Sequence, residues 1–300
     1  MQDIIRIENV EKSFADHQVL KKLSLNVPEQ SVFAFLGNNG AGKSTTIRIL
    51  AGLLGFNGGR VEMFGKTINR FDPSYKKHLG CLIDSPVLYD DLTPNEFLSI
   101  GQRIKGLPKS SIEHALLHVD MKHAANKKIA AFSLGMKQRI ALANALLGEP
   151  KVLLLDEPTN GLDPQGMKEV RSLIKNLPAA IGCTVFLSSH LLDEVEKVSS
   201  HVAIIEAGAT KVQGKLTELL DQSGCLLIDC DNPAKAIALL LKGGYKAFQQ
   251  DNNLVVVSDL DRDNCIAAHH WLFSNHIGVF SSHFTKASLE TYFGEQQLVG

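Results

Sequence analysis

The chain has 300 residues, enough for one large domain or two ordinary ones with a sizeable core. Hydrophobic residues make up 44% and charged residues 21%, which is typical of a globular protein and not of a fibrous or low-complexity one. The 31 Lys and Arg residues nearly balance the 32 Asp and Glu residues, and the net charge is −1. This balance predicts no general attraction to nucleic acid or to an anionic membrane surface.

The sequence carries no signal for membrane insertion or secretion. No apolar run approaches the roughly 20 residues that cross a bilayer. The N-terminal segment MQDIIRIENV has no basic stretch followed by an apolar block, so we expect no secretory signal. Five scattered cysteines without zinc-type spacing predict reduced thiols in a cytoplasmic protein.

The N-terminal part reads as strands followed by a loop and a helix. Residues 4–10 and 23–27 alternate between apolar and polar, and 31–36 is a short apolar run. A Gly-rich turn follows, and then helical spacing over 45–51, which together predict a strand–loop–helix unit. Another short strand is predicted over 60–64.

Helical periodicity then dominates until about residue 147. Thr93, Pro94 and Glu96 predict a helix start with a capping box. Beyond it, strands and helices alternate, which predicts a parallel sheet covered on both faces and an α/β fold class. The strands are expected over 152–155, 184–187 and 202–205, and the helices over 164–177 and 190–199.

The last 80 or so residues form a separate pattern. Strand, helix, two strands, helix and strand in succession would fit a small ferredoxin-like α/β domain. We therefore predict two domains, 1–221 with a helical subdomain over about 85–150, and 222–300. The predicted C-terminal elements cover residues 225–229, 233–241, 254–257, 262–274 and 277–283.

The segment GNNGAGKST has the pattern of a phosphate-binding loop. Such a loop needs glycines that let backbone amides approach a phosphate, and Gly37, Gly40 and Gly42 supply them. Lys43 would reach the terminal phosphates and Ser44 would bind Mg²⁺, with the following helix pointing its positive end at the phosphates. The loop predicts ATP and Mg²⁺ as cofactors, bound by Gly37, Asn38, Asn39, Gly40, Ala41, Gly42, Lys43, Ser44 and Thr45.

Two carboxylates and a histidine complete the predicted site. Asp156 and Glu157 end the apolar strand that begins near Lys151, at the edge where open α/β sheets bind ligands. Asp156 would hold Mg²⁺ and Glu157 would orient or deprotonate the attacking water. His190 follows a third strand, although a lone histidine in that place is more often structural. We take Lys43, Glu157 and His190 as the catalytic candidates.

These motifs, in this order and spacing, resemble those of ATP-binding-cassette (ABC) transporter ATPases over about residues 3–220. The resemblance implies that Phe14 stacks on adenine, whereas an isolated aromatic could equally belong to the core or the surface. Residues 133–136 match the family signature, which usually reads Ser-Gly-Gly-Gln; here Leu134 replaces the first Gly and Met136 replaces the Gln. Ser133, Gly135 and Met136 would touch the nucleotide of a second subunit. Asp163 matches a contact between the two subunits.

One position departs from the family pattern. Asp84 stands where the family usually has a Gln that binds Mg²⁺ and signals to the membrane partner. The stretch from Leu82 to Pro86 looks like the bacitracin-export and lantibiotic-immunity branch, in which an acidic residue often replaces the Gln. Asp84 would then be a Mg²⁺ ligand and coupling residue; the alternative is a carboxylate that caps nearby turn amides.

The resemblance predicts the ATP-hydrolysing subunit of an exporter for a peptide antibiotic or another toxic compound. It implies a homodimer, no nucleic acid, and a separate transmembrane permease that contacts residues 84–105 at the inner face of the cell membrane. The alternatives are a soluble ATPase acting on ribosomes or DNA, and a regulatory switch that binds ATP without turnover. His114 and His118, four apart on a predicted helix, could hold a metal, but no third ligand is apparent and a solvated face is expected.

Overall fold

The computed structural model describes residues 2–69, 72–84, 87–220, 224–250, 254–260, 262–286 and 288–289. The chain divides into two compact units, residues 1–214 and 215–300. This division precedes the predicted boundary at 221 and 222, and both of those positions lie outside the described residues. Each unit is described by itself.

The first unit begins with an antiparallel sheet in the order β2-β1-β4-β5. The two long strands form a hairpin whose register runs from Asp3 opposite Pro28 to Phe14 opposite His17. Both strands extend beyond their predicted bounds, because the polar residues near the turn pair through their backbones without needing an apolar face. The strands are β1 (Asp3–Phe14), β2 (His17–Pro28), β4 (Gly58–Met63) and β5 (Lys66–Thr67).

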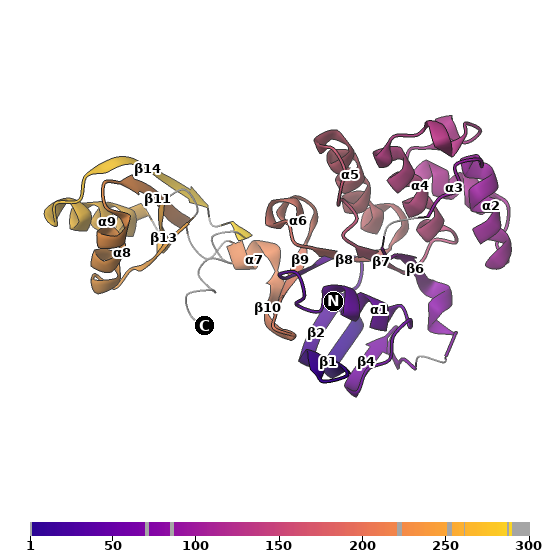
Figure 1. Cartoon of the computed structure of the whole chain (residues 1–300), viewed down its shortest axis with the longest axis horizontal. Helices are drawn as coiled ribbons and strands as arrows, with labels where there is room; N and C mark the ends of the chain where they lie inside the picture. Colours follow the sequence, from indigo (N-terminus) through magenta and orange to yellow (C-terminus); the bar gives the residue numbers. More distant parts are fainter. Residues whose placement is uncertain are drawn as a thin grey trace. The chain divides into compact units, whose positions relative to one another are not determined.

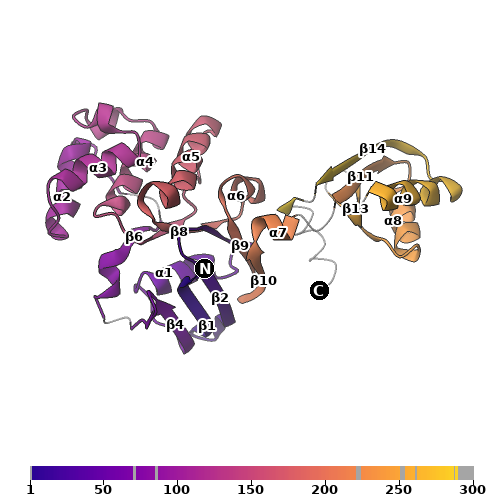
Figure 2. The same ribbon diagram turned by 180° about the vertical axis from the view of Figure 1, so that it is seen from behind.

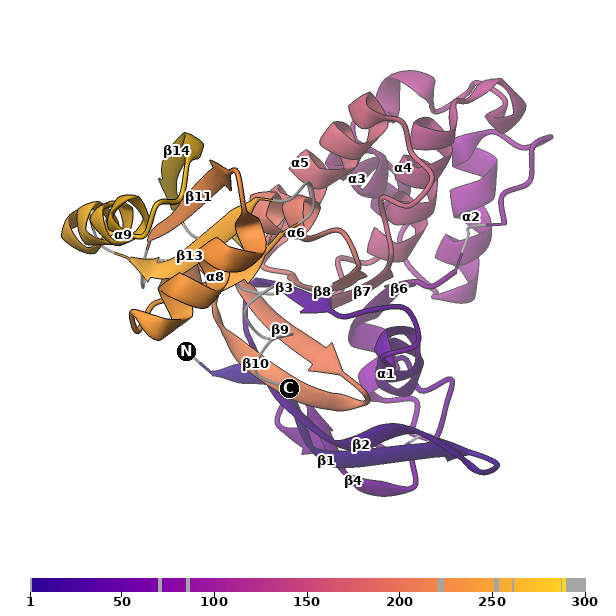
Figure 3. The same cartoon turned by 60° about the vertical axis from the view of Figure 1, so that its left-hand side comes forward.

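A six-stranded sheet in the order β10-β9-β3-β8-β7-β6 forms the centre of the unit. β3 pairs in parallel with β8 and β9, and β7 pairs in parallel with β6 and β8, as the alternating pattern predicts. Figure 3 shows these strands side by side. The strands are β3 (Val32–Leu36), β6 (Leu79–Leu82), β7 (Val152–Asp156), β8 (Thr184–Ser189), β9 (His201–Glu206) and β10 (Ala209–Lys215).

Helices cover both faces of this sheet. The core between the two sheets contains Phe33 and Phe35 of β3 together with Ile47 and Leu50 of α1 (Lys43–Leu50), all fully buried. Figure 3 shows α1 in this position between the sheets. α5 (Pro164–Ile181) and α6 (Leu192–Val198) pack against β3 from the other face.

Three helices form a separate group at the β6 end of the sheet, as Figures 1 and 2 show. The first begins as predicted: Thr93 accepts the Glu96 amide, and Glu96 accepts the Thr93 amide in return. The hydrogen bonds that the Glu96 carboxylate accepts from the amide and from the hydroxyl of Thr93 lower its pKa. The group contains α2 (Pro94–Ile104), α3 (Ser110–His118) and α4 (Leu134–Leu146), with short 3₁₀ turns at Lys122–Ala124 and Ile129–Ala131. A further 3₁₀ turn at Tyr75–His78 precedes β6 and joins the core around α1.

The second unit carries a four-stranded antiparallel sheet in the order β12-β13-β11-β14. Its β-α-β-β-α-β sequence is that of a ferredoxin-like fold, in agreement with the predicted pattern. Ala236 and Leu240 of one helix and Ala268 and Leu272 of the other join a single core with the sheet. The elements are α7 (Leu216–Leu220), β11 (Gly224–Cys230), α8 (Pro233–Lys242), β12 (Lys246–Gln249), β13 (Val255–Leu260), α9 (Arg262–Ser274) and β14 (Val279–Lys286).

Candidate functional site

The register of the parallel sheet brings four predicted segments to one edge. Leu36 of β3 pairs with Ser189 of β8, and Ser188 pairs with Asp156 of β7. Leu82 of β6 pairs with Leu155 of β7, the residue before Asp156. The phosphate-type loop, the two carboxylates, His190 and Asp84 therefore all follow the carboxyl ends of adjacent strands, where open α/β sheets bind ligands.

The loop between β3 and α1 depends on glycine at two positions. A Cβ at Gly37 would lie 2.5 Å from the carbonyl oxygen of Ile205, so the chain can leave the sheet here only without a side chain. Gly42 has φ of 110°, a left-handed conformation that glycine adopts at little cost. α1 begins directly after it with no side-chain cap, which leaves the first-turn amides of the helix for an anion.

The side chain of Lys43 is folded over this loop. Its residue is only 6% exposed, and Nζ donates to the carbonyl of Gly37 at 2.6 Å. The same Nζ lies 3.7 Å from Oε1 of Glu157. Asn38, Asn39 and Gly40 are exposed at the tip, whereas Ala41 is buried and Ser44 and Thr45 are half-buried.

Ser188, which the local sequence pattern did not single out, holds the Asp156 carboxylate and the backbone of Glu157 at the end of β7. The hydroxyl of Ser188 donates to Oδ1 of Asp156 at 2.6 Å and accepts the amide of Glu157 at 3.0 Å. Glu157 has φ of 49°, which is uncommon for a residue with a side chain. The signal for Ser188 was available, because a parallel partner of β7 must place a residue beside Asp156.

The Glu157 carboxylate lies between His190 and Lys43. Its Oε2 is 2.9 Å from Nδ1 of His190, while its Oε1 faces Lys43. The Glu157 side chain is 22% exposed and that of His190 is 40% exposed, so solvent reaches this side of the cluster. The three residues named as catalytic candidates thus meet at one carboxylate.

The predicted signature residues start α4. Ser133 is the exposed N-cap of this helix, and its hydroxyl accepts the amide of Met136 at 3.3 Å. A Cβ on Gly135 would lie 3.4 Å from Cα of Gly166 in α5. Gln138, which the sequence analysis did not select, donates to the carbonyl of Pro158 at 2.7 Å and so ties α4 to the loop after the carboxylates.

Asp163 is the exposed N-cap of α5. Its Oδ1 accepts the amide of Gly166 at 3.3 Å. Ser133 and Asp163 therefore both cap the start of a helix in the same way, and both are exposed. The two helix starts lie close together, because Gly135 contacts Gly166.

The remaining two predicted residues have partners that the sequence did not indicate. Both carboxylate oxygens of Asp84 accept from one guanidinium nitrogen of Arg48 in α1, at 2.9 and 3.1 Å, and Asp84 adopts φ of 62°. Ser85 and Pro86, which complete this stretch, lie outside the described residues. Phe14 is 46% exposed at the β1–β2 turn, and Nζ of Lys12 lies 5.0 Å from its ring centroid.

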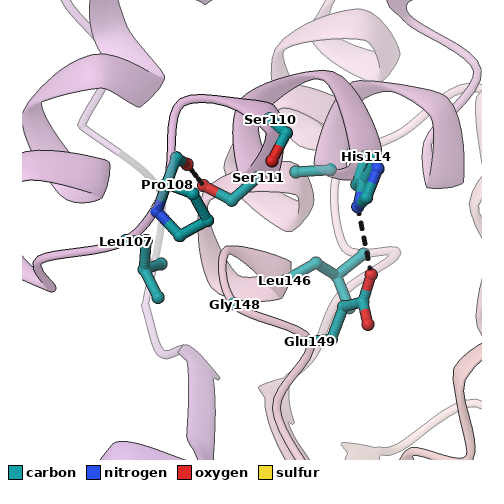
Figure 4. Close-up of a pocket in the computed structure, with 9 residues that line it drawn as sticks. Leu107, Pro108, Ser110, Ser111, His114, Leu146, Gly148 and Glu149 are labelled. Atoms are coloured by element: carbon teal, nitrogen blue, oxygen red, sulfur yellow. Dashed lines mark hydrogen bonds and ion pairs between the residues drawn. The ribbon is translucent and has the colours of Figure 1, made fainter.

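A pocket of about 300 Å³ lies elsewhere, in the helical group. Figure 4 shows His114 of α3 pointing across it to Glu149, with 3.4 Å between Nδ1 and Oε1. No cluster of three or more His, Cys, Asp or Glu side chains suited to a metal occurs in the described part of the chain. The pocket is lined by Leu107, Pro108, Ser110, Ser111, His114, Ala115, Leu146, Gly148 and Glu149.

Among the described residues, no helix has both the length and the apolar character to cross a membrane.

Comparison with known proteins gives consistent matches. The family model described as "ABC transporter" matches residues 20–160. The chain is 35% identical over 299 residues to the bacitracin transport ATP-binding protein BcrA of Bacillus licheniformis, covering 98% of this chain and 97% of the relative. It is 36% identical over 205 residues to the lantibiotic transport ATP-binding protein SrtF of Streptococcus pyogenes, covering 68% and 88%.

Among solved structures, cbiO1 of Clostridium perfringens, described as part of the ABC transporter complex cbiONQ, is similar with a TM-score of 0.68. The match covers 74% of this chain and 92% of cbiO1, at 29% identity.

Proposed function

The chain belongs to the family of ABC transporter ATP-binding proteins, and we propose that it powers the export of a peptide antibiotic or another toxic compound by hydrolysing ATP. The observation that carries the proposal is that Lys43 and His190 both contact the Glu157 carboxylate beside the phosphate loop. The named relatives transport bacitracin and lantibiotics, and they favour this function over a soluble ATPase acting on ribosomes or DNA.

In this proposal the loop Gly37–Thr45 binds the phosphates of ATP. Lys43 leaves the carbonyl of Gly37 and its position near Glu157 to contact the β- and γ-phosphates. The free amides at the start of α1 and the positive end of that helix act on the same groups. Phe14, exposed at the end of its hairpin, stacks on the adenine ring.

The hard oxygen donors of Ser44 and Asp156 fit Mg²⁺, which prefers such ligands. Asp156 is fixed by the Ser188 hydroxyl, and Ser44 lies in the first turn of α1 beside Lys43. When bound, Mg²⁺ would neutralise part of the phosphate charge that develops during the reaction. We propose Asp84 as a further ligand or relay, for which it must first leave Arg48.

Glu157 is proposed as the residue that takes a proton from the attacking water. Its Oε2 lies 2.9 Å from Nδ1 of His190, and this contact keeps the Glu157 carboxylate directed along the sheet edge. In the proposal, His190 also contacts the γ-phosphate. Once Lys43 moves to the phosphates, the nearest positive partner of Glu157 is lost, and its carboxylate becomes the base that accepts the proton.

A second copy of the chain completes the site in this proposal. Ser133, Gly135 and Met136 start a helix whose first turn faces outward, and they contact the γ-phosphate held by the partner copy. Asp163 caps the neighbouring helix and contacts the partner directly. The result is a homodimer with two ATP molecules at its interface.

The transport step requires a separate transmembrane permease, and we propose that residues 84–105 contact it at the inner face of the cell membrane. We propose that a separate C-terminal unit begins at about residue 222.

The test has a biochemical and a cellular arm. The purified chain should release phosphate from ATP, and a Glu157→Gln variant should not. Cells that express the chain with its cognate permease should tolerate more bacitracin or a lantibiotic than cells with the Glu157→Gln variant. Equal phosphate release by both proteins would reject the hydrolytic role, and equal tolerance to both compounds would reject the proposed cargo.

A further inference from the structure

Ser188 is the last paired residue of β8 on the side of the two carboxylates. It is fully buried, and its register partner is Asp156. A serine hydroxyl has one proton to donate and two lone pairs to accept with. Here the proton goes to Oδ1 of Asp156 at 2.6 Å, and a lone pair accepts the amide of Glu157 at 3.0 Å. One oxygen atom therefore joins the side chain of one carboxylate residue to the backbone of the next.

The backbone at Glu157 requires such a restraint. Its φ of 49° lies in the left-handed region, which is uncommon and unfavourable for a residue with a Cβ. The strand pairing of β7 with β8 ends at Asp156, so the Glu157 amide has no ladder partner in β8. The Ser188 oxygen takes that place and directs the chain into the turn that points Glu157 toward Lys43 and His190.

The adjacent serine acts on the next turn. The hydroxyl of Ser189 accepts the amide of Leu191 at 3.1 Å, in the segment that carries His190. The two serines therefore have different partners although they are neighbours, because consecutive strand residues point to opposite faces of the sheet. Of the two serines, Ser188 bonds the Asp156 carboxylate and the Glu157 amide.

We propose that Ser188 is a positioning residue for ATP hydrolysis, which fixes the Asp156 carboxylate and the backbone of Glu157 with a single hydroxyl. The inference rests on the proposed ATPase function and adds a residue to it. Ser188 does not touch the nucleotide. Its loss leaves the phosphate loop intact but lets Glu157 leave the geometry in which it accepts a proton, and misplacement of about 1 Å can cost about 100-fold in rate.

The experiment compares Ser188→Ala with a chemically identical control. Ser31→Ala removes the same atom from another buried serine, whose hydroxyl donates to the carbonyl of Pro28 at the opposite end of the sheet. We expect Ser188→Ala to lower kcat by about 10- to 100-fold. The Kd for ATP, measured without Mg²⁺, should stay within about twofold of wild type. Ser188→Thr, which keeps the hydroxyl, should restore kcat, and Ser31→Ala should leave it unchanged.

A second readout needs no turnover. Hydrogen exchange at the Glu157 amide should be slow in the wild-type chain and in Ser31→Ala, and at least about 10-fold faster in Ser188→Ala, because the acceptor is gone. Should Ser188→Ala fail to fold, Ser188→Cys keeps the volume and offers only a weak donor and acceptor, and it should be slow in hydrolysis. A wild-type kcat in either variant, or an equally slow Ser188→Thr, overturns the proposal. A wild-type chain that hydrolyses no ATP refutes the proposed function instead, and the exchange result still decides whether Ser188 holds the turn.

Discussion

Replacing Glu157 with Gln should affect ATP binding and ATP hydrolysis in opposite directions. The substitution keeps the shape of the side chain and removes its charge. Hydrolysis should fall by about 10²- to 10⁴-fold, since a positioned general base contributes that much. Binding should become tighter, because the Lys43 ammonium, 3.7 Å from Oε1, no longer has an anionic partner that competes with the phosphates.

The size of the binding effect follows from this ion pair. Two unit charges 4 Å apart attract each other by about 4 kcal/mol at an effective dielectric constant of 20 and by about 1 kcal/mol in water. The Lys43 side chain is 7% exposed and that of Glu157 is 22% exposed, so removing both groups from water offsets much of the attraction. A net value of about 1 kcal/mol corresponds to ATP binding that is about fivefold tighter.

Phosphate release and equilibrium dialysis of ATP without Mg²⁺ would measure the two effects separately. Glu149→Gln is a suitable control, because it makes the same change at a carboxylate in the helical group, where Glu149 contacts His114. Phosphate release within twofold of wild type would refute the role of Glu157 as a base. ATP affinity that is equal to or weaker than that of wild type would refute the competition for Lys43.

Three further predictions concern other parts of the first unit. Asp84→Asn should reduce coupled export more than ATP binding, because it removes the charge of the proposed Mg²⁺ ligand or relay without changing the loop; wild-type export by this variant would contradict it. Gly42→Ala should weaken ATP binding by at least about 10-fold in the same dialysis assay, since φ of 110° is strained for any residue with a Cβ, and unaltered affinity would show that the loop adapts. Thr93→Ala should lower the free energy of unfolding by about 1 kcal/mol in urea titrations at neutral pH. The pKa of Glu96 is lowered in the folded state by bonds from both the amide and the hydroxyl of Thr93, and only the hydroxyl is lost in the variant. What the ionised carboxylate gains from that hydroxyl is complete above the usual pKa of about 4.3 and is lost as the pH falls through the folded value, so the difference between the two proteins should shrink in acid. A constant difference would show that the Thr93 hydroxyl does not act through the Glu96 carboxylate.

Much of the fold could be predicted from the sequence, because the strands at the centre of the six-stranded sheet must be apolar. β3, β7, β8 and β9 are buried on both faces and read as continuous apolar runs, which is the pattern of parallel strands. β6 was not predicted, because Gly80 interrupts its four residues. The structure explains this glycine: a Cβ there would lie 2.2 Å from the carbonyl oxygen of Ala145 in α4. Close approach of two backbones leaves little trace in a local sequence pattern.

The candidate site was predictable wherever one residue type is needed for its chemistry. The glycines and Lys43 of the loop, and the carboxylates after β7, carry their meaning in the local sequence. Ser188, Gln138 and Arg48 do not, because each acts through a residue that lies 20 or more positions away in the chain. Such partners become visible only when the register of the strands and the packing of the helices are known.

The contact between Gly135 and Gly166 limits how the first unit can move. A methyl group on Gly166 would lie 2.8 Å from Oδ1 of Asp163 and 3.6 Å from Cα of Gly135, so the starts of α4 and α5 fit together without a gap. The hydrogen bond from Gln138 to Pro158 adds a second link to the same block. Any tilt of the helical group must therefore displace the segment after Glu157 as well. Each chain would thus transmit a change at its own carboxylates, as a rigid-body displacement, to the two helix starts that are proposed to contact a second copy.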